Sequence, residues 1–261
     1  MSQQTGKYVL VNGLKMYYEL HGQGYPLVLI HGGGSTIDST FGRVLQTFAA
    51  THMVIAVEMQ AHGRTTDMDR PMTFEQDADD IAALLAHLDI PKADIFGFSN
   101  GGTTTLQVAI RHPQLVNKIV VASGMYKRDG TYPWFWDMMS NSSLDDMPDA
   151  LKQAYLHVNP SQEGLVAMYN RDVSRMIAFK DIDEAYIRAI KASALIVQGD
   201  QDVVTTEHAV ELYRNIPGAS LLILPGGHGD YIGEISALKA GTVAEYPAVA
   251  VIEAFLNAPS N

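Results

Sequence analysis

Short, largely apolar runs recur along this chain, and they constrain its fold more than any other feature. A strand that is buried on both faces of a sheet reads as a continuous apolar run rather than as an alternating one. Helical patterns lie between several of these runs, and strands that alternate with helices predict a mostly parallel sheet covered by helices on both faces. The runs are residues 27–30, 53–57, 93–96, 118–122, 194–197 and 221–224.

The clearest helical pattern covers residues 74–88, where apolar side chains recur on one face. Thr73 and Gln76 have the spacing of a capping box at its start. Before the first apolar run, residues 8–20 hold two extended stretches that flank an Asn-Gly pair at 12–13, which suits a type I′ turn. The chain is therefore expected to open with an antiparallel hairpin.

One segment, residues 125–190, interrupts the alternation of strands and helices. It contains no apolar strand run, but it holds both tryptophans of the chain and many of its tyrosines and methionines. No flexible linker separates it from the rest, so we expect it to pack on the sheet domain. The predicted organisation is one sheet domain formed by residues 1–124 and 191–261, with residues 125–190 inserted as a helical cap.

The composition narrows the class of partners. Of the 261 residues, 47% are hydrophobic and 18% are charged, as in an ordinary globular protein, and the formal net charge is −11. Nucleic acids and anionic membranes attract basic surfaces, so neither is an expected partner. The chain has no cysteine, its N-terminus is polar, and no apolar run reaches the ~18 residues of a membrane span. We expect a cytoplasmic protein, monomeric or homodimeric, whose partner is a small-molecule substrate.

The stretch GFSNGG, residues 97–102, places Ser99 between a strand-like run and a helical pattern over residues 104–112. A turn this tight holds the serine in a strained conformation, and bulky residues two positions either side would collide, so Gly97 and Gly101 are needed. The helix that follows also directs its N–H groups towards the site. A Gly-rich turn without chemistry is the plainer interpretation, but the strand–turn–helix context favours a nucleophile.

A serine hydroxyl is a weak nucleophile without a base, and the base is expected to be a histidine. His228 follows the last apolar run in a Gly-rich loop, and this position favours it as the base over a solvated loop histidine. His31 is interpreted as a structural residue beside the glycines that follow it, and His62 as a turn histidine bonded to the backbone. The other histidines are expected at the surface: His21, His52, His87, His112, His157 and His208.

The acid that orients this base should stand where another strand ends. The segment ALIVQGDQD, residues 194–202, offers Asp200 and Asp202, and either of them could instead cap a helix over residues 206–215. We favour Asp202 over Asp200. With the serine and the histidine it gives the chain order Ser, Asp, His, which is the order of one hydrolase fold and differs from two other known orders of this triad.

A run of glycines, residues 32–34, follows the apolar run at 27–30. Glycines there let backbone N–H groups approach a developing negative charge. The expected oxyanion donors are the N–H groups of Gly33 and of Asn100, which follows the serine. A phosphate-binding loop is the alternative, but the chain has no G-x-x-x-x-G-K-[ST] motif, and the spacing does not give G-x-G-x-x-G before a clean helix.

Five segments together resemble the α/β-hydrolase superfamily, in this order and over nearly the whole chain: LVLIHGGG, VIAVEMQAHGRT, GFSNGG, ALIVQGDQD and LPGGHGD. The resemblance implies an eight-stranded, mostly parallel sheet with a helical cap after the sixth strand. It also implies Ser99 as nucleophile, Asp202 as acid and His228 as base, with no cofactor and no metal. Relatives commonly carry Asp and Gly where this chain has Glu58 and Ala61, which suggests that this turn accepts a Cβ.

The identity of the nucleophile and the composition of the cap bear on the substrate. Epoxide hydrolases and haloalkane dehalogenases of this fold use Asp in place of the serine, so the serine argues against both. The aromatic and methionine side chains of the cap indicate a largely apolar, adaptable pocket, although most of them could simply pack the cap onto the sheet. The candidates to line the pocket are Tyr126, Met139, and Trp134 and Trp136, which would share a side if their stretch were extended.

The leading hypothesis is a serine hydrolase that cleaves a small carboxylic ester or lactone through an acyl-enzyme. Three alternatives stay open: a carbon–carbon bond hydrolase that uses the same triad, an acyltransferase or perhydrolase, and a non-catalytic small-molecule receptor. A receptor has no need for a serine, an aspartate and a histidine at the positions of a catalytic triad, which argues against the last of these.

Overall fold

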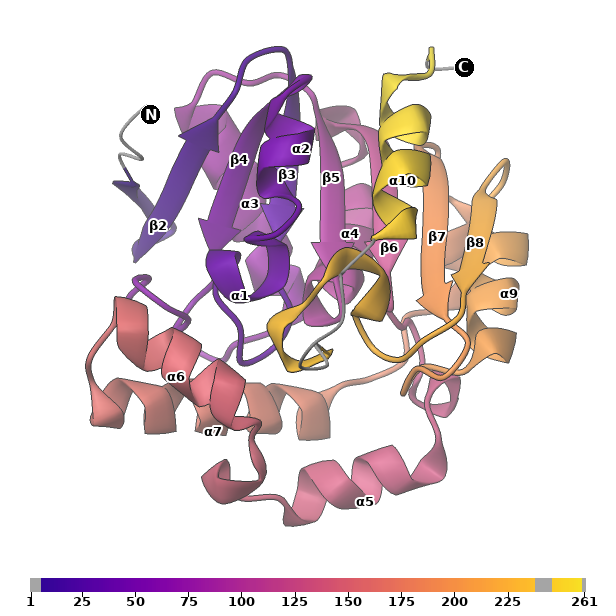
Figure 1. Cartoon of the computed structure of the whole chain (residues 1–261). Helices are drawn as coiled ribbons and strands as arrows, with labels where there is room; N and C mark the ends of the chain where they lie inside the picture. The colour runs from indigo at the N-terminus through magenta and orange to yellow at the C-terminus, as the bar shows by residue number, and fades with distance from the viewer. Residues whose placement is uncertain (1–5, 238–245, 260–261) are drawn as a thin grey trace.

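An eight-stranded sheet lies at the centre of the structure, a computed structural model that describes residues 6–237 and 246–259. The strands lie side by side in the order β1-β2-β4-β3-β5-β6-β7-β8 (Figure 1). β2 is antiparallel to β1 and to β4, and the other neighbouring pairs are parallel. Residues 1–5, which belong to the polar N-terminus noted in the sequence, lie outside the described residues. The strands are β1 (Lys7–Val11), β2 (Leu14–His21), β3 (Tyr25–Ile30), β4 (His52–Glu58), β5 (Ala93–Phe98), β6 (Val116–Ala122), β7 (Ser193–Gly199) and β8 (Ser220–Leu224).

The predicted hairpin at the start of the chain is confirmed. β1 and β2 are antiparallel and are joined by Asn12 and Gly13, whose φ angles are 49° and 85°. A type I′ turn requires a positive φ at both of its central residues, which Asn and Gly tolerate best. The hairpin therefore adds two antiparallel strands to one edge of the parallel sheet.

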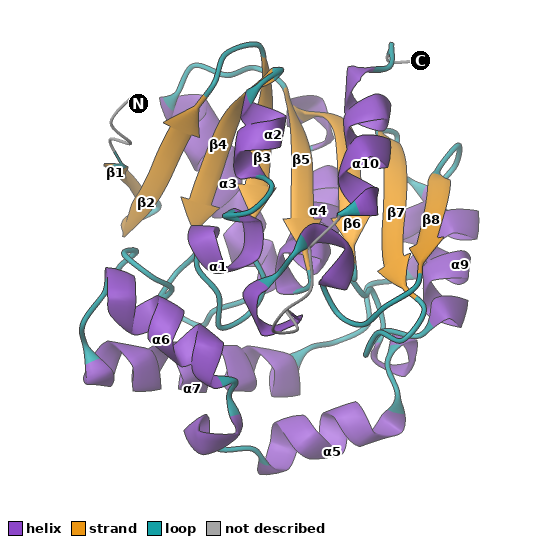
Figure 2. Ribbon diagram, in the orientation of Figure 1, coloured by secondary structure: helices purple, strands orange, loops and turns teal. Residues whose placement is uncertain are grey.

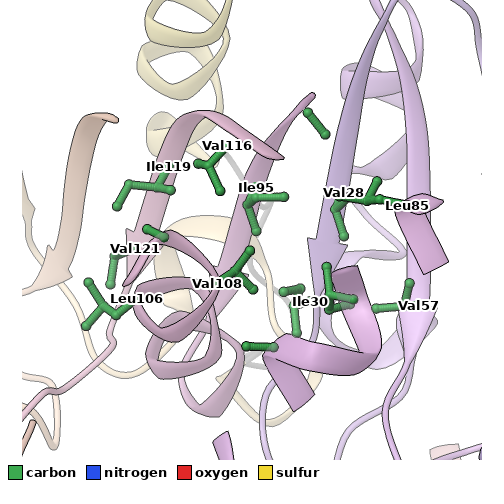
Figure 3. Close-up of a cluster of buried hydrophobic side chains, with 14 of the residues drawn as sticks. Val28, Ile30, Val57, Leu85, Ile95, Leu106, Val108, Val116, Ile119 and Val121 are labelled. Atoms are coloured by element: carbon green, nitrogen blue, oxygen red, sulfur yellow. The ribbon is translucent and has the colours of Figure 1, made fainter. Parts of the chain in front are cut away.

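The apolar runs form strands because each strand is buried on both of its faces. Successive side chains of a strand point to opposite faces of the sheet. In β3, Val28 and Ile30 pack into one hydrophobic core cluster, whereas Leu27 and Leu29 pack into the other. Figure 3 shows the first cluster, in which Val28 lies near Leu85 from a covering helix.

Helices cover both faces of the sheet (Figure 2), so the predicted fold class is confirmed. Within the described ranges, no helix has the length and apolarity that crossing a membrane requires. The helices that pack into the first core cluster are α3 (Phe74–His87), α4 (Asn100–Arg111), α8 (Glu184–Arg188) and α9 (Thr206–Asn215). Those that pack into the second are α1 (Ile37–Phe41), α2 (Leu45–Ala49) and α10 (Pro247–Asn257).

Two helix starts differ in detail from the sequence prediction. Thr73 caps α3, and its side chain accepts a hydrogen bond from the Gln76 N–H at 3.1 Å. The reciprocal half of the capping box is not formed, because the Gln76 side chain donates instead to Asp80 Oδ1 at 3.1 Å. α4 begins at Asn100 rather than at residue 104, since the helix follows the serine turn without an intervening loop.

Between β6 and β7 the chain forms helices that stand apart from the sheet layers. Figure 1 shows α5, α6 and α7 lying across the carboxyl ends of the parallel strands. Ile187 and Ile190, which also fall within the predicted cap at 125–190, pack instead into the first core cluster of the sheet. The domain division at residues 125 and 190 stays a prediction. The helices of this region that precede α8 are α5 (Pro133–Asn141), α6 (Asp149–Val158) and α7 (Gln162–Ala178).

Candidate active site

Ser99 sits on a strained turn between β5 and α4. Its φ of 56° and ψ of −120° lie in a region that side chains other than glycine rarely adopt. A Cβ on Gly97 would stand 1.9 Å from the Gly101 carbonyl oxygen, and a Cβ on Gly101 would stand 2.1 Å from the Ile30 carbonyl oxygen. The two glycines therefore allow the close backbone contact that holds the serine at the carboxyl end of the sheet, as the sequence predicted.

His228 lies between Ser99 and Asp202. Its Nε2 is 2.9 Å from Ser99 Oγ, and its Nδ1 is 2.6 Å from Asp202 Oδ1. Burial acts to lower the pKa of His228, but the Asp202 carboxylate outweighs burial and the pKa is raised. Burial acts to raise the pKa of Asp202, but His228 and the hydrogen bonds to the carboxylate lower it. The pair thus combines an ionised carboxylate with an imidazole whose second nitrogen faces a hydroxyl.

Asp202, rather than Asp200, faces the imidazole. Asp202 is buried and also accepts a hydrogen bond from Ser123 Oγ at 2.5 Å. Asp200 is exposed, and its carboxylate accepts the Gly226 N–H at 2.9 Å, in the loop that precedes the histidine. The alternative that either aspartate caps the next helix is wrong, because Thr205 is the N-cap of α9.

The predicted oxyanion donors lie beside the serine. Gly33 and Asn100 line the same cavity as Ser99. Among the described residues, neither backbone N–H donates a hydrogen bond to an acceptor. A Cβ on Gly33 would stand 2.4 Å from the Asn100 side-chain nitrogen, so a larger residue at position 33 would displace the Asn100 side chain. The next N–H along, that of Gly34, is already donated to Asp172 Oδ2 at 2.6 Å. The geometry therefore leaves two N–H groups available next to the serine hydroxyl.

The cavity in front of Ser99 has a volume of about 380 Å³ and lies between the sheet and the cap helices. Among the described residues that line it there is no lysine and no arginine, and two are the aspartates Asp146 and Asp172. No group of three or more His, Asp or Glu within residues 6–237 and 246–259 is arranged to hold a metal ion. Methionines dominate the apolar part of the wall: Met125, Met138, Met139, Met147, Met168 and Met176.

Three of the four predicted pocket residues lie elsewhere. Met139 lines the cavity, but Tyr126, Trp134 and Trp136 do not. The predicted extended stretch is the helix α5, which turns Trp134 outward so that it is 51% exposed. Trp136 stacks on Phe179, at 6.3 Å between ring centroids, and is absent from the cavity lining. Tyr126 is buried in the first core cluster and does not face the cavity.

Sequence reasoning missed a second contact between an aspartate and a histidine, in which the aspartate lines the cavity. Asp172, on α7, has its Oδ2 2.8 Å from His62 Nε2 and accepts the Gly34 N–H. It also pairs with Arg175, whose other nitrogen donates to Asp77 Oδ2, on α3, at 2.7 Å. The i, i+3 spacing of Asp172 and Arg175 is a signal in the sequence, but this spacing is too common on helices to single them out.

Two histidines that were expected at the surface are buried. His52 and His208 are each 2% exposed. The His208 ring stacks on Tyr126 at 4.7 Å between centroids, and burial lowers its pKa to about 4. His31 has the structural role predicted for it, since its Nε2 accepts the Met59 N–H at 3.1 Å.

The turn after β4 is more constrained than the sequence suggested. Ala61 has a φ of 64°, in the left-handed region that favours glycine, so its Cβ is accepted only in a conformation that alanine rarely adopts. Glu58 is buried and pairs with Arg64 at 2.7 Å, and burial raises its pKa to about 7 in spite of the guanidinium. This turn leads directly to His62, so its geometry sets where that histidine stands.

Comparisons with known proteins agree with the fold. The family model described as the alpha/beta hydrolase fold matches residues 25–146. The 2-hydroxymuconate semialdehyde hydrolase of Pseudomonas sp. (strain CF600) is 25% identical, over 96% of this chain and 98% of that protein. The pimeloyl-[acyl-carrier protein] methyl ester esterase of Neisseria meningitidis is 28% identical, over 81% of this chain and 89% of that protein.

The solved structures give the same result for the fold. The enol-lactonase from Burkholderia xenovorans LB400 superposes with a TM-score of 0.76 at 20% identity, over 97% of this chain and 100% of that chain. Three observations identify the fold: the strand order, the turn that carries Ser99 and the match to the family model. The chain has the α/β-hydrolase fold and is a hydrolase similar to known members of that superfamily.

Proposed function

We propose that this hydrolase cleaves small, uncharged carboxylic esters or lactones through an acyl-enzyme formed on Ser99. The observation that carries the proposal is the line of contacts from Asp202 through His228 to Ser99 Oγ, at the wall of an apolar cavity. A hydroxyl, a base and an orienting carboxylate in this geometry are the parts that acyl transfer requires.

The first half of the proposed reaction forms the acyl-enzyme. Ser99 Oγ attacks the substrate carbonyl carbon while its proton passes to His228 Nε2, and the carbonyl electron pair moves onto the oxygen. The N–H groups of Gly33 and Asn100 stabilise this oxyanion. The intermediate then collapses, the bond to the alcohol oxygen breaks, and the His228 imidazolium gives its proton to the leaving alkoxide.

The second half repeats these steps with water in place of the serine hydroxyl. His228 takes a proton from the water, which attacks the acyl carbon, and the proton then returns to Ser99 Oγ as the carboxylic acid leaves. Asp202 stays ionised throughout and stabilises the imidazolium that forms twice in each cycle. The raised pKa of His228, which Asp202 maintains against burial, is consistent with that role.

The charge of the cavity supports an uncharged substrate. The described lining has no lysine or arginine to pair with a substrate carboxylate, and the exposed Asp146 would repel one. This argues against a substrate such as the muconate semialdehyde in the name of one relative, and it favours the ester and lactone chemistry named for the others. The methionine-rich wall suits flexible acyl chains of several lengths.

A carbon–carbon bond hydrolase is the second candidate, supported by the match to the semialdehyde hydrolase along nearly the full length of both chains. The test uses p-nitrophenyl esters of increasing chain length together with a matched pair, a neutral diester and its half-ester carboxylate. We expect turnover of the neutral esters, at least about tenfold weaker turnover of the half-ester, and no activity in Ser99→Ala. Labelling by a fluorophosphonate without turnover of any ester would favour the second candidate.

The same probe checks the nucleophile itself. We expect a fluorophosphonate adduct on Ser99, because this hydroxyl alone among the described serines faces His228 Nε2. Ser123 also lines the cavity, but its hydroxyl donates to Asp202. Mass spectrometry that places the adduct on Ser123 or on Ser35 would overturn the assignment.

A further inference from the structure

The cap and the glycine loop meet at one carboxylate, that of Asp172. Asp172 is 9% exposed and lies on α7, which crosses the carboxyl ends of the strands (Figure 1). Its Oδ2 accepts the N–H of Gly34 at 2.6 Å. Gly34 directly follows Gly33, whose own N–H is one of the two proposed oxyanion donors. A side chain of the cap therefore holds the backbone immediately beside that donor.

The hydrogen-bond neighbours of His62 indicate the protonation state of its ring. His62 Nε2 is 2.8 Å from Asp172 Oδ2, and His62 Nδ1 is 2.8 Å from the Gln60 carbonyl oxygen. Both neighbours are acceptors, so both ring nitrogens carry a proton and His62 is an imidazolium. The Gly34 N–H also stands 3.2 Å from His62 Nε2, but a protonated nitrogen cannot accept, so this N–H donates to the carboxylate.

The core holds Asp172 from its other side as well. Arg175 pairs with the second carboxylate oxygen of Asp172 and, through another nitrogen, with Asp77 on α3 at 2.7 Å. Its guanidinium lies over the Phe74 ring at 4.7 Å from the ring centroid. His62, Arg175 and the Gly34 N–H together occupy both oxygens of Asp172, so this carboxylate is not available to bind a substrate cation.

We propose that Asp172 is a positioning residue for the oxyanion hole: it fixes the Gly33–Gly34 backbone, so that the Gly33 N–H points at the developing negative charge only when the cap is seated. The inference rests on the proposed function, because it assigns Gly33 as a donor. A glycine loop has many accessible conformations, and a charge-assisted hydrogen bond selects one of them. Misplacement of a reacting group by about 1 Å costs on the order of a hundredfold in rate.

The test is Asp172→Asn, which keeps the size of the side chain. The amide of the variant has one oxygen in place of two, and the donors are Arg175, His62 and the Gly34 N–H. Arg175 is always charged, so we expect the amide oxygen to accept from it. The amide N–H₂ then faces the Gly34 N–H, which loses its acceptor. We expect kcat for a p-nitrophenyl acetate substrate to fall about tenfold to a hundredfold, while KM changes by less than about twofold. Asp172→Ala, which removes all three contacts, should lose a similar factor in kcat.

The matched control is Asp77→Asn, which cuts the same network at its core end but leaves the contact between Asp172 and Gly34. We expect a lower unfolding midpoint than wild type and kcat within about twofold of it. Equal loss of kcat in Asp77→Asn and Asp172→Asn would overturn the inference, because the network would then only stabilise the fold. Unchanged kcat in both Asp172 variants would overturn it as well.

Two further variants remove the remaining ambiguities. If Asp172→Asn and Asp172→Ala do not fold, Asp172→Glu keeps the charge for His62 and Arg175 but displaces the oxygen from Gly34. It should show the same loss of kcat, and wild-type kcat would overturn the inference. Ser99→Ala, assayed in parallel, separates the two proposals. Residual esterase activity there would refute the proposed function, whereas an inactive Ser99→Ala beside a fully active Asp172→Asn would refute only this inference.

Discussion

Two aspartate–histidine pairs each contribute one residue, His228 or Asp172, to the cavity wall, and they differ in what the second ring nitrogen faces. In one pair, Asp202 and His228 both come from the ends of sheet strands, and the free nitrogen faces the hydroxyl of Ser99. In the other pair, Asp172 comes from the cap and His62 from the sheet domain, and the second nitrogen faces a backbone carbonyl. The contact distances are nearly the same, 2.6 Å and 2.8 Å.

The difference shows that a carboxylate beside an imidazole does not by itself make a base. Both carboxylates raise the pKa of their histidine against burial. A hydroxyl can give up its proton to the imidazole, so His228 can cycle between its two states. The carbonyl that faces His62 only accepts, and this histidine is held in its charged state as a fixed cation. One pair is therefore suited to proton transfer and the other to fastening the cap.

The largest loss of activity is expected when the first pair is broken. Asp202→Asn should lower kcat by about 10⁴-fold, the factor known for the corresponding change in the trypsin-type triad, because the amide cannot hold the required tautomer. Asp200→Asn is the control, since Asp200 is exposed and its carboxylate accepts the Gly226 N–H rather than facing His228. Steady-state kinetics on one ester measures both variants. A larger loss in Asp200→Asn than in Asp202→Asn would show that the wrong acid was chosen.

The buried Arg175, which joins the second pair to Asp77, should matter most for stability. Arg175→Met leaves the buried carboxylate of Asp77 without its partner, and removing one member of a buried ion pair costs about 3 kcal/mol or more. Urea denaturation gives the free energy of unfolding of this variant and of Asp202→Asn. We expect the larger loss in Arg175→Met. The comparison of the two pairs fails if Asp202→Asn is the less stable protein.

The sheet and the first pair could be predicted from the sequence because their signals are local. The apolar runs specify doubly buried strands, and the glycines around Ser99 specify its turn. The second pair could not be predicted, because His62 and Asp172 are far apart in the chain and only the packing of the cap brings them together. The misplaced tryptophans had a local signal that was overlooked: Pro133 is favoured at the first position of a helix, which contradicts an extended stretch.

The pH dependence of the reaction should report the first pair alone. The pKa of His228 is raised above 6.5, and the base must be unprotonated, so kcat/KM should fall by about tenfold per pH unit below that pKa. Asp202→Asn removes the largest influence that raises the pKa and leaves burial, which lowers it, opposed only by the weaker effect of Glu234, so its acidic limb should move to lower pH. Asp172→Asn should leave the limb where it is. A shift in Asp172→Asn would mean that the two pairs are coupled.

The smallest expected effect concerns a cap residue that lines the cavity, as distinct from the cap residues that hold the cap on the sheet domain. Met139 lines the cavity, whereas Trp134, on the same helix, is exposed. Met139→Ala should remove apolar contact worth about 1–2 kcal/mol from kcat/KM for a long-chain ester and almost nothing for an acetate. Trp134→Ala is the matched control and should leave both substrates within about twofold of wild type.

This contrast depends on chain length because Met139 can only contact groups that extend beyond the reacting carbonyl, whereas Asp172 acts on the site where every substrate reacts. The measurement is the ratio of kcat/KM for an octanoate ester to that for an acetate ester in each variant. Met139→Ala should lower this ratio, and Asp172→Asn should lower both values and leave the ratio unchanged. Equal losses on both esters in Met139→Ala would mean that this part of the cap also acts through the geometry of the oxyanion hole.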